Sequence, residues 1–404
     1  MKIGIFIADS NGGYPVPASR GGAVSTLVEH LVKENNEKQM TDLDIITIYD
    51  EKAKNLSRQY PNIKFIWMKP WPWLRFLDKL LFECVRVLLK NKKATSYKSL
   101  FSLLFCIIQS SGIIKKNSYD KVVLENNIPL AWAVRLSKIK GNYYYHFHNV
   151  PRIDAGCRTV FENCTGFLCV SQYVAKQIRS ETSSIGAIPE SKIKVLYNCI
   201  DTKQYCPLKD AEEKNRIRKI YGIGEKDKLI VFVGRLSEEK GIDKVIEAVQ
   251  LLHREDIKLL IAGGLLPGSS CKDEYQKKLY EMAKNSLESV IFTGYISQDK
   301  IQRIYQIADV AVLPSIWEEP AGLTMVEAIA CGIPVITTDS GGIPEYMGKH
   351  AIVLRRNEIL VKNISEKIEQ LLKRNELSIE DNINYVIKNY DSATYLERFI
   401  ECLV

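Results

Sequence analysis

Two cations lie close together in the segment from Val233 to Gly241, which reads VGRLSEEKG. Arg235 and Lys240 follow an apolar run typical of a strand and precede a helical pattern. Both side chains can therefore project from one tight turn. An Arg can bind a diphosphate through two hydrogen bonds, and a Lys adds a point charge. The alternative is a solvated turn in which Glu238 and Glu239 pair with the cations.

Two carboxylates frame a second segment, EPAGLTMVE, from Glu319 to Glu327. Gly322 and Leu323 stand where an apolar helix begins, and amides at a helix N-terminus favour phosphate. Glu327 lies about one turn into this helix, where a carboxylate can accept hydrogen bonds from ribose hydroxyls. It could instead simply complement the helix dipole. Glu319 precedes the helix and can reach sugar hydroxyls.

Gly21 and Gly22 stand between a long loop and a helix that we expect to begin near Ala23. Glycine lets a phosphate come close to helix-start amides, although an ordinary loop-to-helix turn explains the pair equally well. The spelling differs from GxGxxG, so no nicotinamide cofactor is indicated.

Two histidines, His146 and His148, end the run YYYHFHN from Tyr143 to Asn149. Side chains alternate along a strand, so both lie on one face. This spacing could suit a metal, but we see no third ligand of obvious spacing and expect no metal site. Hydrogen bonding to a sugar hydroxyl is the favoured role, and structural hydrogen bonding to the backbone is the alternative.

Strand-like apolar runs alternate with helical patterns, which predicts parallel sheets covered on both faces. The runs are Ile3–Ile7, Leu43–Ile48, Ile63–Trp67, Val122–Leu124, Tyr143–His146, Phe167–Val170, Leu229–Val233, Lys258–Ile261, Val290–Phe292, Val310–Leu313 and Val335–Thr337. The length of 404 residues favours two domains.

The polar segment from Asn198 to Pro207 interrupts this rhythm. We therefore expect two doubly wound, Rossmann-like α/β domains, at residues 1–200 and 201–385. A helix at 386–404 is expected to pack back towards the first domain. Ligands bind beyond the carboxyl ends of strands in such sheets, so we expect the two domains to face each other across a cleft that holds the site.

The composition, with 26% charged residues, is typical of a soluble globular protein. The apolar run at the N-terminus is too short for a signal peptide, and Leu100 to Ile114 is interrupted by polar residues. The ten cysteines fit no common zinc pattern. We expect reduced thiols and a cytoplasmic chain.

The order of these motifs resembles the retaining glycosyltransferases of family 4, which have the GT-B fold. The Gly-Gly loop, the strand-end His, GR-x4-K and E-P-x-G-L…E occur in sequence, followed by A-x-G-x-P-V-I at Ala330–Ile336 and SGGIPE at Ser340–Glu345. The N-terminal PVPA and RGG are similar to the subgroup of the spore coat protein SA type. Cys199 stands where the family often has Gly.

The resemblance implies a nucleotide diphosphate sugar, with UDP the expected nucleotide, as co-substrate and no cofactor or metal. It implies diphosphate binding by the two cations and the glycine-rich amides, ribose binding by Glu327, and nucleobase binding near Tyr295. The implied catalytic residues are His148, Arg235, Lys240 and Glu319. The implied donor-binding residues are Gly21, Gly22, Arg235, Lys240, Tyr295, Ile296, Gly322, Leu323 and Glu327.

The implied reaction is transfer of a hexose, with retention, to a glycan or lipid-linked acceptor in cell-surface polysaccharide synthesis. Two alternatives stay open: a nucleotide-sugar 2-epimerase, and a non-catalytic coat or surface protein that keeps the fold. Asp42 and Asp44 spell DxD, the metal motif of the other large glycosyltransferase fold. They stand at the start of a strand, so we expect a turn and strand cap there.

Basic residues gather between Lys64 and Lys98, with nine Lys or Arg against two acids. Trp71 and Trp73 lie among them, and an amphipathic stretch continues to Lys93. Tryptophans beside cations suit a bilayer interface with anionic lipids. We expect peripheral docking of residues 64–98 on the inner face of the cell membrane, with a solvated basic helix as the alternative. No nucleic-acid motif accompanies the charge.

Overall fold

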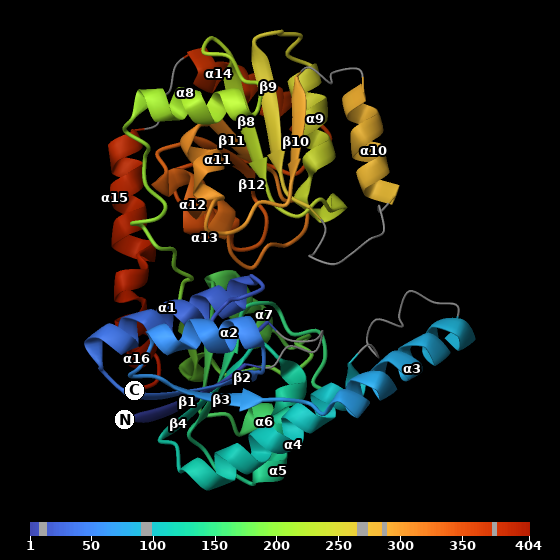
Figure 1. Ribbon diagram of the computed structural model, residues 1–404, viewed down its shortest axis with the longest axis vertical. Coiled ribbons are helices and arrows are strands. Elements are labelled where there is room, and N and C mark those ends of the chain that lie inside the picture. The colour runs from blue at the N-terminus through green and yellow to red at the C-terminus, as the bar shows by residue number, and fades with distance from the viewer. Residues whose placement is uncertain (8–13, 90–98, 265–273, 285–288, 374–377) are drawn as a thin grey trace. The chain divides into compact units, whose positions relative to one another are not determined.

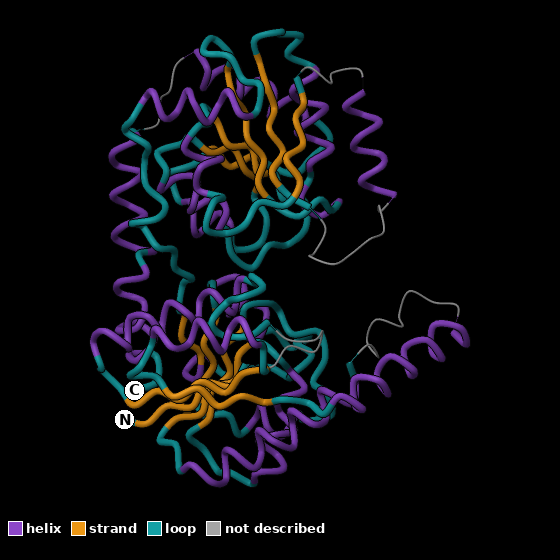
Figure 2. Tube along the Cα trace, in the orientation of Figure 1, coloured by secondary structure: helices purple, strands orange, loops and turns teal. Residues whose placement is uncertain are grey.

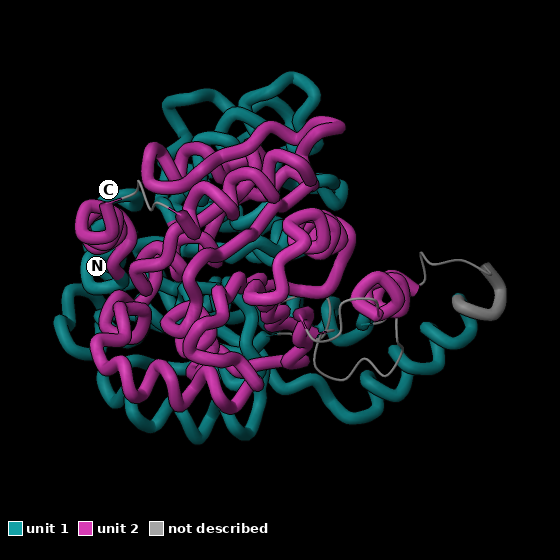
Figure 3. The backbone as a smooth tube through the Cα atoms, turned by 90° about the horizontal axis from the view of Figure 1, so that it is seen from above, with its two compact units in different colours: residues 1–197, 392–404 teal, residues 198–391 magenta. Residues whose placement is uncertain are grey.

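The computed structural model describes residues 1–404 except 8–13, 90–98, 265–273, 285–288 and 374–377. It divides into two compact units (Figure 3). The first contains Met1–Tyr197 and Ser392–Val404, and the second contains Asn198–Asp391. We expected boundaries after residues 200 and 385, and the units meet after residues 197 and 391. The second difference arises because helix α15 (Ile379–Tyr390) spans the expected boundary and belongs to the second unit.

The described part of the first unit contains a seven-stranded parallel sheet of order β3-β2-β1-β4-β5-β6-β7. Helices α1 and α2 lie on one face of this sheet and α4 and α5 on the other (Figure 1). The strands are β1 (Lys2–Phe6), β2 (Asp42–Ile48), β3 (Lys64–Met68), β4 (Lys121–Glu125), β5 (Tyr143–Phe147), β6 (Gly166–Cys169) and β7 (Ile193–Val195). The helices are α1 (Ala23–Lys38), α2 (Glu51–Leu56), α3 (Pro72–Leu89), α4 (Leu100–Asn117), α5 (Ala131–Ser137), α6 (Arg158–Glu162), α7 (Gln172–Arg179) and α16 (Tyr395–Glu401).

The second unit has a six-stranded parallel sheet of order β10-β9-β8-β11-β12-β13 among its described residues. Its strands and helices follow one another along the chain (Figure 2). The strands are β8 (Lys228–Val233), β9 (Ile257–Ala262), β10 (Val290–Gly294), β11 (Val310–Leu313), β12 (Val335–Thr338) and β13 (Ile352–Leu354). The helices are α8 (Ala211–Ile220), α9 (Ile242–Gln250), α10 (Glu274–Ala283), α11 (Gln302–Gln306), α12 (Leu323–Ala330), α13 (Ile343–Met347), α14 (Leu360–Lys373) and α15.

Continuous apolar runs form the central strands because each sheet is covered on both faces. Leu229, Ile230 and Val231 of β8 are successive residues with 0% exposure. Alternation of apolar and polar residues would be expected only if one face met water. The segment from Val233 to Gly241 begins at the end of β8, and the segment from Glu319 to Glu327 comes after β11. Because β8 and β11 are parallel neighbours, both segments lie at the same edge of the sheet.

The segment after Asp391 completes the first unit. Helix α16 packs on α1, and Lys38 at the end of α1 donates to the Ala393 carbonyl at 2.6 Å. The Tyr144 hydroxyl of β5 donates to the Leu403 carbonyl at 3.0 Å. The expected single helix at 386–404 is therefore divided between α15 and α16, which belong to different units.

Asp44 of the DxD spelling lies inside β2 and is buried. Its Oδ2 accepts hydrogen bonds from the Tyr119 hydroxyl at 2.9 Å and from Lys64 Nζ at 3.1 Å. These contacts give the side chain a structural role.

No helix within the described ranges combines the length and the apolar character needed to cross a bilayer.

Candidate active site

Arg235 and Lys240 emerge from the turn between β8 and α9, which the neighbouring loop holds in place. The Ile316 amide donates to the Glu239 carbonyl at 2.9 Å. Gly241 has φ 68°, and a Cβ there would lie 2.3 Å from the Pro314 carbonyl oxygen. This left-handed residue in close contact with backbone can only be glycine.

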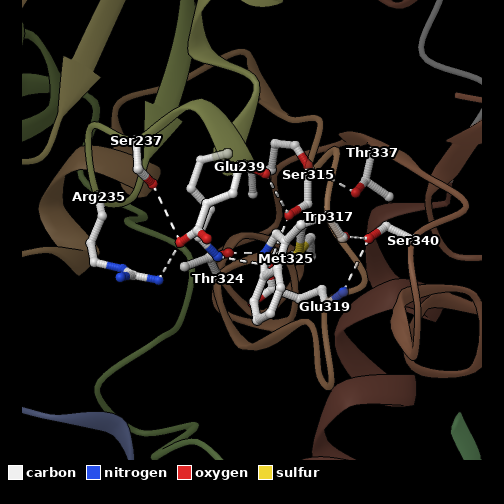
Figure 4. Close-up of polar contacts among 12 residues, drawn as sticks. Arg235, Ser237, Glu239, Ser315, Trp317, Glu319, Thr324, Met325, Thr337 and Ser340 are labelled. Atoms are coloured by element: carbon white, nitrogen blue, oxygen red, sulfur yellow. Dashed lines mark hydrogen bonds and ion pairs between the residues drawn. The ribbon is translucent and has the colours of Figure 1, made fainter. Parts of the chain in front are cut away.

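Each cation pairs with a carboxylate, and Figure 4 shows the pair of Arg235 with Glu239. Arg235 Nη2 lies 2.6 Å from Glu239 Oε1, and the Arg235 side chain is 56% exposed. Lys240 Nζ lies 2.7 Å from Glu319 Oε2. Pairing within the turn, the alternative considered above, thus occurs for Arg235 only. Lys240 pairs instead with Glu319 in the segment after β11.

Three donors fix the carboxylate of Glu319. Besides Lys240, the Ser315 hydroxyl and Trp317 Nε1 donate to Glu319 Oε2 at 2.8 and 2.9 Å. The Glu319 amide donates to Ser340 Oγ at 3.1 Å. Because all three side-chain donors meet one oxygen, the group is held in one orientation, with its second oxygen outside these bonds (Figure 4).

A pocket of about 240 Å³ opens at the carboxyl ends of β8 and β11. Its lining combines apolar strand residues, the two cations and the first turn of α12. The lining residues are Phe232, Val233, Gly234, Arg235, Lys240, Leu313, Ser315, Thr324 and Met325. Gly322 is the N-cap of α12 and Leu323 its first residue, with no side chain capping the helix. Helix-start amides and two cations thus gather beside one cavity, as anion binding requires.

Glu327 lies further along α12 and meets a partner that sequence reasoning missed. The Tyr305 hydroxyl donates to Glu327 Oε2 at 3.0 Å. Burial raises the pKa of Glu327 to about 7, against the lowering effect of this hydrogen bond. Tyr305 comes from α11, and nothing in the local sequence of Glu327 indicates it.

Tyr295 and Ile296 follow β10, in the same unit as the pocket, but neither lines it. Tyr295 is 59% exposed. Their expected contact with a nucleobase stays a prediction.

Gly21 and Gly22 precede α1 in the first unit. Gly22 has φ 106°, and a Cβ would lie 2.9 Å from the Tyr14 ring. This close approach of ring and backbone explains the glycine independently of any phosphate. Residues 8–13 of the preceding loop lie outside the described residues.

His146 and His148 also belong to the first unit, and both approach Glu125 at the end of β4. His148 Nε2 lies 2.8 Å from Glu125 Oε2, and His146 Nδ1 lies 3.1 Å from the same oxygen. The two rings lie beside each other at the end of β5, with centroids 4.1 Å apart. Glu125 is a third group suited to metal binding, where we expected none: the three ligand atoms lie within 4.8 Å of one another.

The cluster is electrostatically coupled. Burial alone would raise the pKa of Glu125, but His146 and His148 outweigh that effect and lower it to about 2. Burial, assisted by His146, lowers the pKa of His148 to about 4. Around neutral pH the carboxylate is therefore ionised and His148 is neutral.

Comparison with known proteins places this geometry in a family. A family model described as "Glycosyl transferases group 1" matches residues 213–389. YtcC of Bacillus subtilis, whose name assigns it to the glycosyltransferases, is 33% identical over 363 residues, covering 87% of this chain and 78% of YtcC. Spore coat protein SA of the same organism is 26% identical over 388 residues, covering 93% and 91%.

Solved structures confirm the fold class. Anabaena Alr3699/HepE in complex with UDP-glucose superposes with a TM-score of 0.71 at 18% identity, covering 100% of this chain and 99% of that one. The two parallel-sheet units are accordingly those of the GT-B α/β fold. With YtcC matched over most of both chains, this protein belongs to the group 1 glycosyltransferases.

Proposed function

We propose that the protein is a retaining, metal-independent glycosyltransferase. It would move a hexose from a UDP-sugar to a glycan or lipid-linked acceptor in cell-surface polysaccharide synthesis. One observation carries the proposal: Arg235, Lys240 and the first turn of α12 line a single pocket beside the fixed carboxylate of Glu319. The UDP-glucose bound by HepE supports UDP as the nucleotide.

The residues divide the work by charge. Arg235 and Lys240 neutralise the diphosphate, together with amides at the start of α12. Glu327 accepts from the ribose hydroxyls. Lys240, Ser315 and Trp317 all bind Glu319 Oε2. The other oxygen, Oε1, accepts a hydrogen bond from a hydroxyl of the sugar.

We propose the following reaction at this site. The bond between the anomeric carbon and the diphosphate oxygen breaks, and the acceptor hydroxyl forms its bond on the same face. The acceptor proton passes to the departing phosphate oxygen. Because negative charge grows on the leaving group, prearranged cations stabilise the transition state more than the ground state.

Arg235→Ala tests the proposal. Loss of one such charged donor should lower turnover by about 100- to 1000-fold, or about 3–4 kcal/mol. Release of UDP from a panel of UDP-sugars with acceptor measures it. Arg216→Ala is a matched control, because Arg216 is also exposed and pairs with Glu213 at 3.8 Å but does not line the pocket. Near-normal turnover by Arg235→Ala would remove this residue from the mechanism.

Incubation with donor alone separates the alternatives. A 2-epimerase yields an isomeric nucleotide sugar, whereas a glycosyltransferase yields at most free UDP and sugar. A non-catalytic coat protein does neither. Formation of the isomer would replace our proposal with the epimerase.

Our proposal for the acceptor is based on exposed residues in and next to helix α3. Trp71, Trp73 and Phe76 are 58%, 53% and 66% exposed, and Leu80 one turn later is 52% exposed. We call these four residues the α3 apolar patch. Lys69, Arg75 and Lys79 stand among them, and Trp and basic side chains together favour an anionic bilayer surface. We therefore propose that α3 docks on a membrane and that the acceptor is lipid-linked.

The α3 apolar patch has a fixed support. Asp78 on the opposite side of α3 is buried and accepts from the amides of Phe101 and Ser102 at the start of α4, at 2.7 and 3.2 Å. Asp78 thus ties the helix to α4 while the residues of the α3 apolar patch stay exposed. Residues 90–98 of the expected basic stretch, including Lys93, lie outside the described residues.

A further inference from the structure

A buried tyrosine meets the carboxylate of Glu327 from a neighbouring helix. Tyr305 of α11 is 0% exposed, and its hydroxyl donates to Glu327 Oε2 at 3.0 Å. Helix α11 packs on α12, which carries Glu327. A hydroxyl so deeply buried is costly without a hydrogen-bond partner, and Glu327 supplies one. Glu327 itself is only partly buried, so it stays accessible to a ligand.

Helix α12 brings this carboxylate into line with the donor pocket. Thr324 lines the pocket, and Glu327 follows it by three residues. Side chains three residues apart lie on one face of a helix, about 4.5 Å apart along its axis. A nucleotide with its diphosphate in the pocket and its ribose further along α12 would place the ribose hydroxyls beside Glu327. The pocket, α11 and α12 all belong to the second unit.

The hydrogen bond from Tyr305 orients the carboxylate of Glu327. The last torsion of a glutamate side chain is broad, so its carboxylate turns readily unless it is held. Tyr305 binds one oxygen, Oε2, and thereby selects one orientation of the group. Two neighbouring hydroxyls can bind a carboxylate together only if it faces them, and an orientation that is set in advance lowers the cost of binding.

The surroundings of Glu327 also control its charge. Burial outweighs the lowering effect of Tyr305 and Tyr205 and raises the pKa of Glu327 to about 7. Cys331 interacts with the same carboxylate. Burial raises the pKa of the two tyrosines and of the Cys331 thiol above their ordinary values, so all three stay protonated around neutral pH. Glu327 is therefore the member of this group that changes charge near neutral pH, and the Tyr305 hydroxyl favours its ionised form.

We propose that Tyr305 is a positioning residue for nucleotide recognition, whose hydroxyl keeps the carboxylate of Glu327 ionised and oriented so that both hydroxyls of the donor ribose can donate to it. This rests on the proposed function, in which Glu327 binds the ribose. An ionised carboxylate only accepts hydrogen bonds, and each hydroxyl of the ribose can donate one. The site should therefore select nucleotides that carry a ribose over those whose sugar lacks these hydroxyls. Tyr305 acts through Glu327 and need not touch substrate.

Titration of UDP and of 2′,3′-dideoxy-UDP compares two ligands that differ only in the ribose hydroxyls. The wild type should bind UDP about 10- to 100-fold more tightly, because hydrogen bonds to a charged group are strong. Tyr305→Phe should weaken UDP binding about 10-fold and leave binding of the dideoxy nucleotide nearly unchanged. Isothermal titration calorimetry measures both affinities. Equal weakening for the two nucleotides, or an unchanged UDP affinity, would contradict the proposal.

Tyr275→Phe is the matched control. Tyr275 is also buried, at 6% exposure, and its hydroxyl donates to Asp243 Oδ1 at 3.0 Å in the same unit. It lies outside the set of residues that line the donor pocket. This variant removes the same hydroxyl from another carboxylate and should leave both affinities unchanged. Equal loss of ribose selectivity in the two variants would show a general effect of destabilisation and overturn the role of Tyr305.

The wild type alone provides a second measurement, which decides if Tyr305→Phe does not fold. Protonation removes the charge of Glu327, so the preference for UDP over the dideoxy nucleotide should decrease as the pH falls through about 7. The two ligands share the diphosphate, and its titration therefore cancels in the ratio of their affinities. In a folded Tyr305→Phe the decrease should begin at higher pH, because the carboxylate has lost a donor. A ratio that does not change with pH in the wild type would overturn the proposal.

Failure of this inference and failure of the proposed function give different results. A wild type that binds UDP with a selectivity independent of Tyr305 rejects the inference alone. The ribose is common to all ribonucleotides, so the matching pairs of adenine and guanine diphosphates replace the uracil pair if UDP does not bind. A wild type that binds none of them rejects the proposed function, and this inference with it.

Discussion

At the scale of residues, both cations of the donor pocket already form ion pairs with carboxylates. The Arg235–Glu239 pair is exposed, and such pairs contribute about 0–1 kcal/mol. The pair of Lys240 with Glu319 is more enclosed, with side chains 20% and 17% exposed, and Glu319 has two further donors. A diphosphate should therefore displace Glu239 from Arg235 more easily than it separates Lys240 from Glu319.

Glu239→Gln should consequently tighten UDP binding. Removing the competing carboxylate should lower the Kd roughly 2- to 5-fold, and the gain should shrink in high salt because the pair is exposed. Isothermal titration calorimetry with UDP measures this. Glu238→Gln is the control, since it changes net charge equally from the adjacent position. Equal gains in the two variants would show a general charge effect and refute competition by Glu239.

Residues of the site were predictable where they are close in sequence. Arg235 and Lys240 share one turn, so their spacing alone placed them together. Glu125 was missed because it comes 21 residues before His146, and only the β4–β5 register unites them. The partner of Glu327 was missed for the same reason, since Tyr305 lies 22 residues away.

At the scale of elements, the turn after β8 depends on a glycine that no other residue can replace. Gly241 and Gly222 have nearly equal φ angles, 68° and 70°, but only Gly241 has backbone where a Cβ would stand. The two glycines therefore separate backbone strain from steric exclusion.

Gly241→Ala should destabilise the protein more than Gly222→Ala. Both variants incur the left-handed penalty of about 1–2 kcal/mol. Gly241→Ala should add about 1–3 kcal/mol from the clash with the Pro314 carbonyl. It should also weaken UDP binding, because the turn carries Arg235 and Lys240. Urea unfolding and UDP titration measure these effects. Similar losses in both variants would mean that the contact with Pro314 is relieved at little cost.

Element types were easier to predict than element edges. The long apolar runs correctly predicted the central strands, since burial on both faces leaves a clear pattern. The edge strands β7 and β13 were missed, because each has three residues that are mostly only partly buried. The order of the strands in each sheet could not be predicted from the local hydrophobic pattern, because it depends on contacts between segments that are distant in sequence.

At the scale of the whole molecule, the two units have different proposed roles. The second holds the donor pocket, and the first holds His148 and the α3 apolar patch. The membrane proposal concerns the first unit, and a binding assay can test it without any knowledge of the acceptor.

Flotation with vesicles tests the α3 apolar patch. The protein should float with anionic vesicles at low salt, less at moderate salt, and least with neutral vesicles. Replacement of Trp71, Trp73 and Phe76 by Ser should abolish flotation. Ile220→Ser is the control, because Ile220 is 73% exposed but lies on α8 in the other unit. Absence of wild-type binding to anionic vesicles would reject the membrane proposal.

The return of the chain to the first unit after Asp391 affects the order in which the protein can be completed on the ribosome. Tyr395, Leu396 and Phe399 of α16 are buried, and their helix covers part of α1. That part of α1 stays open to water until translation has passed through the entire second unit. The second unit, continuous in sequence, can fold before the first is closed, and a nascent chain halted between them presents an apolar surface to chaperones.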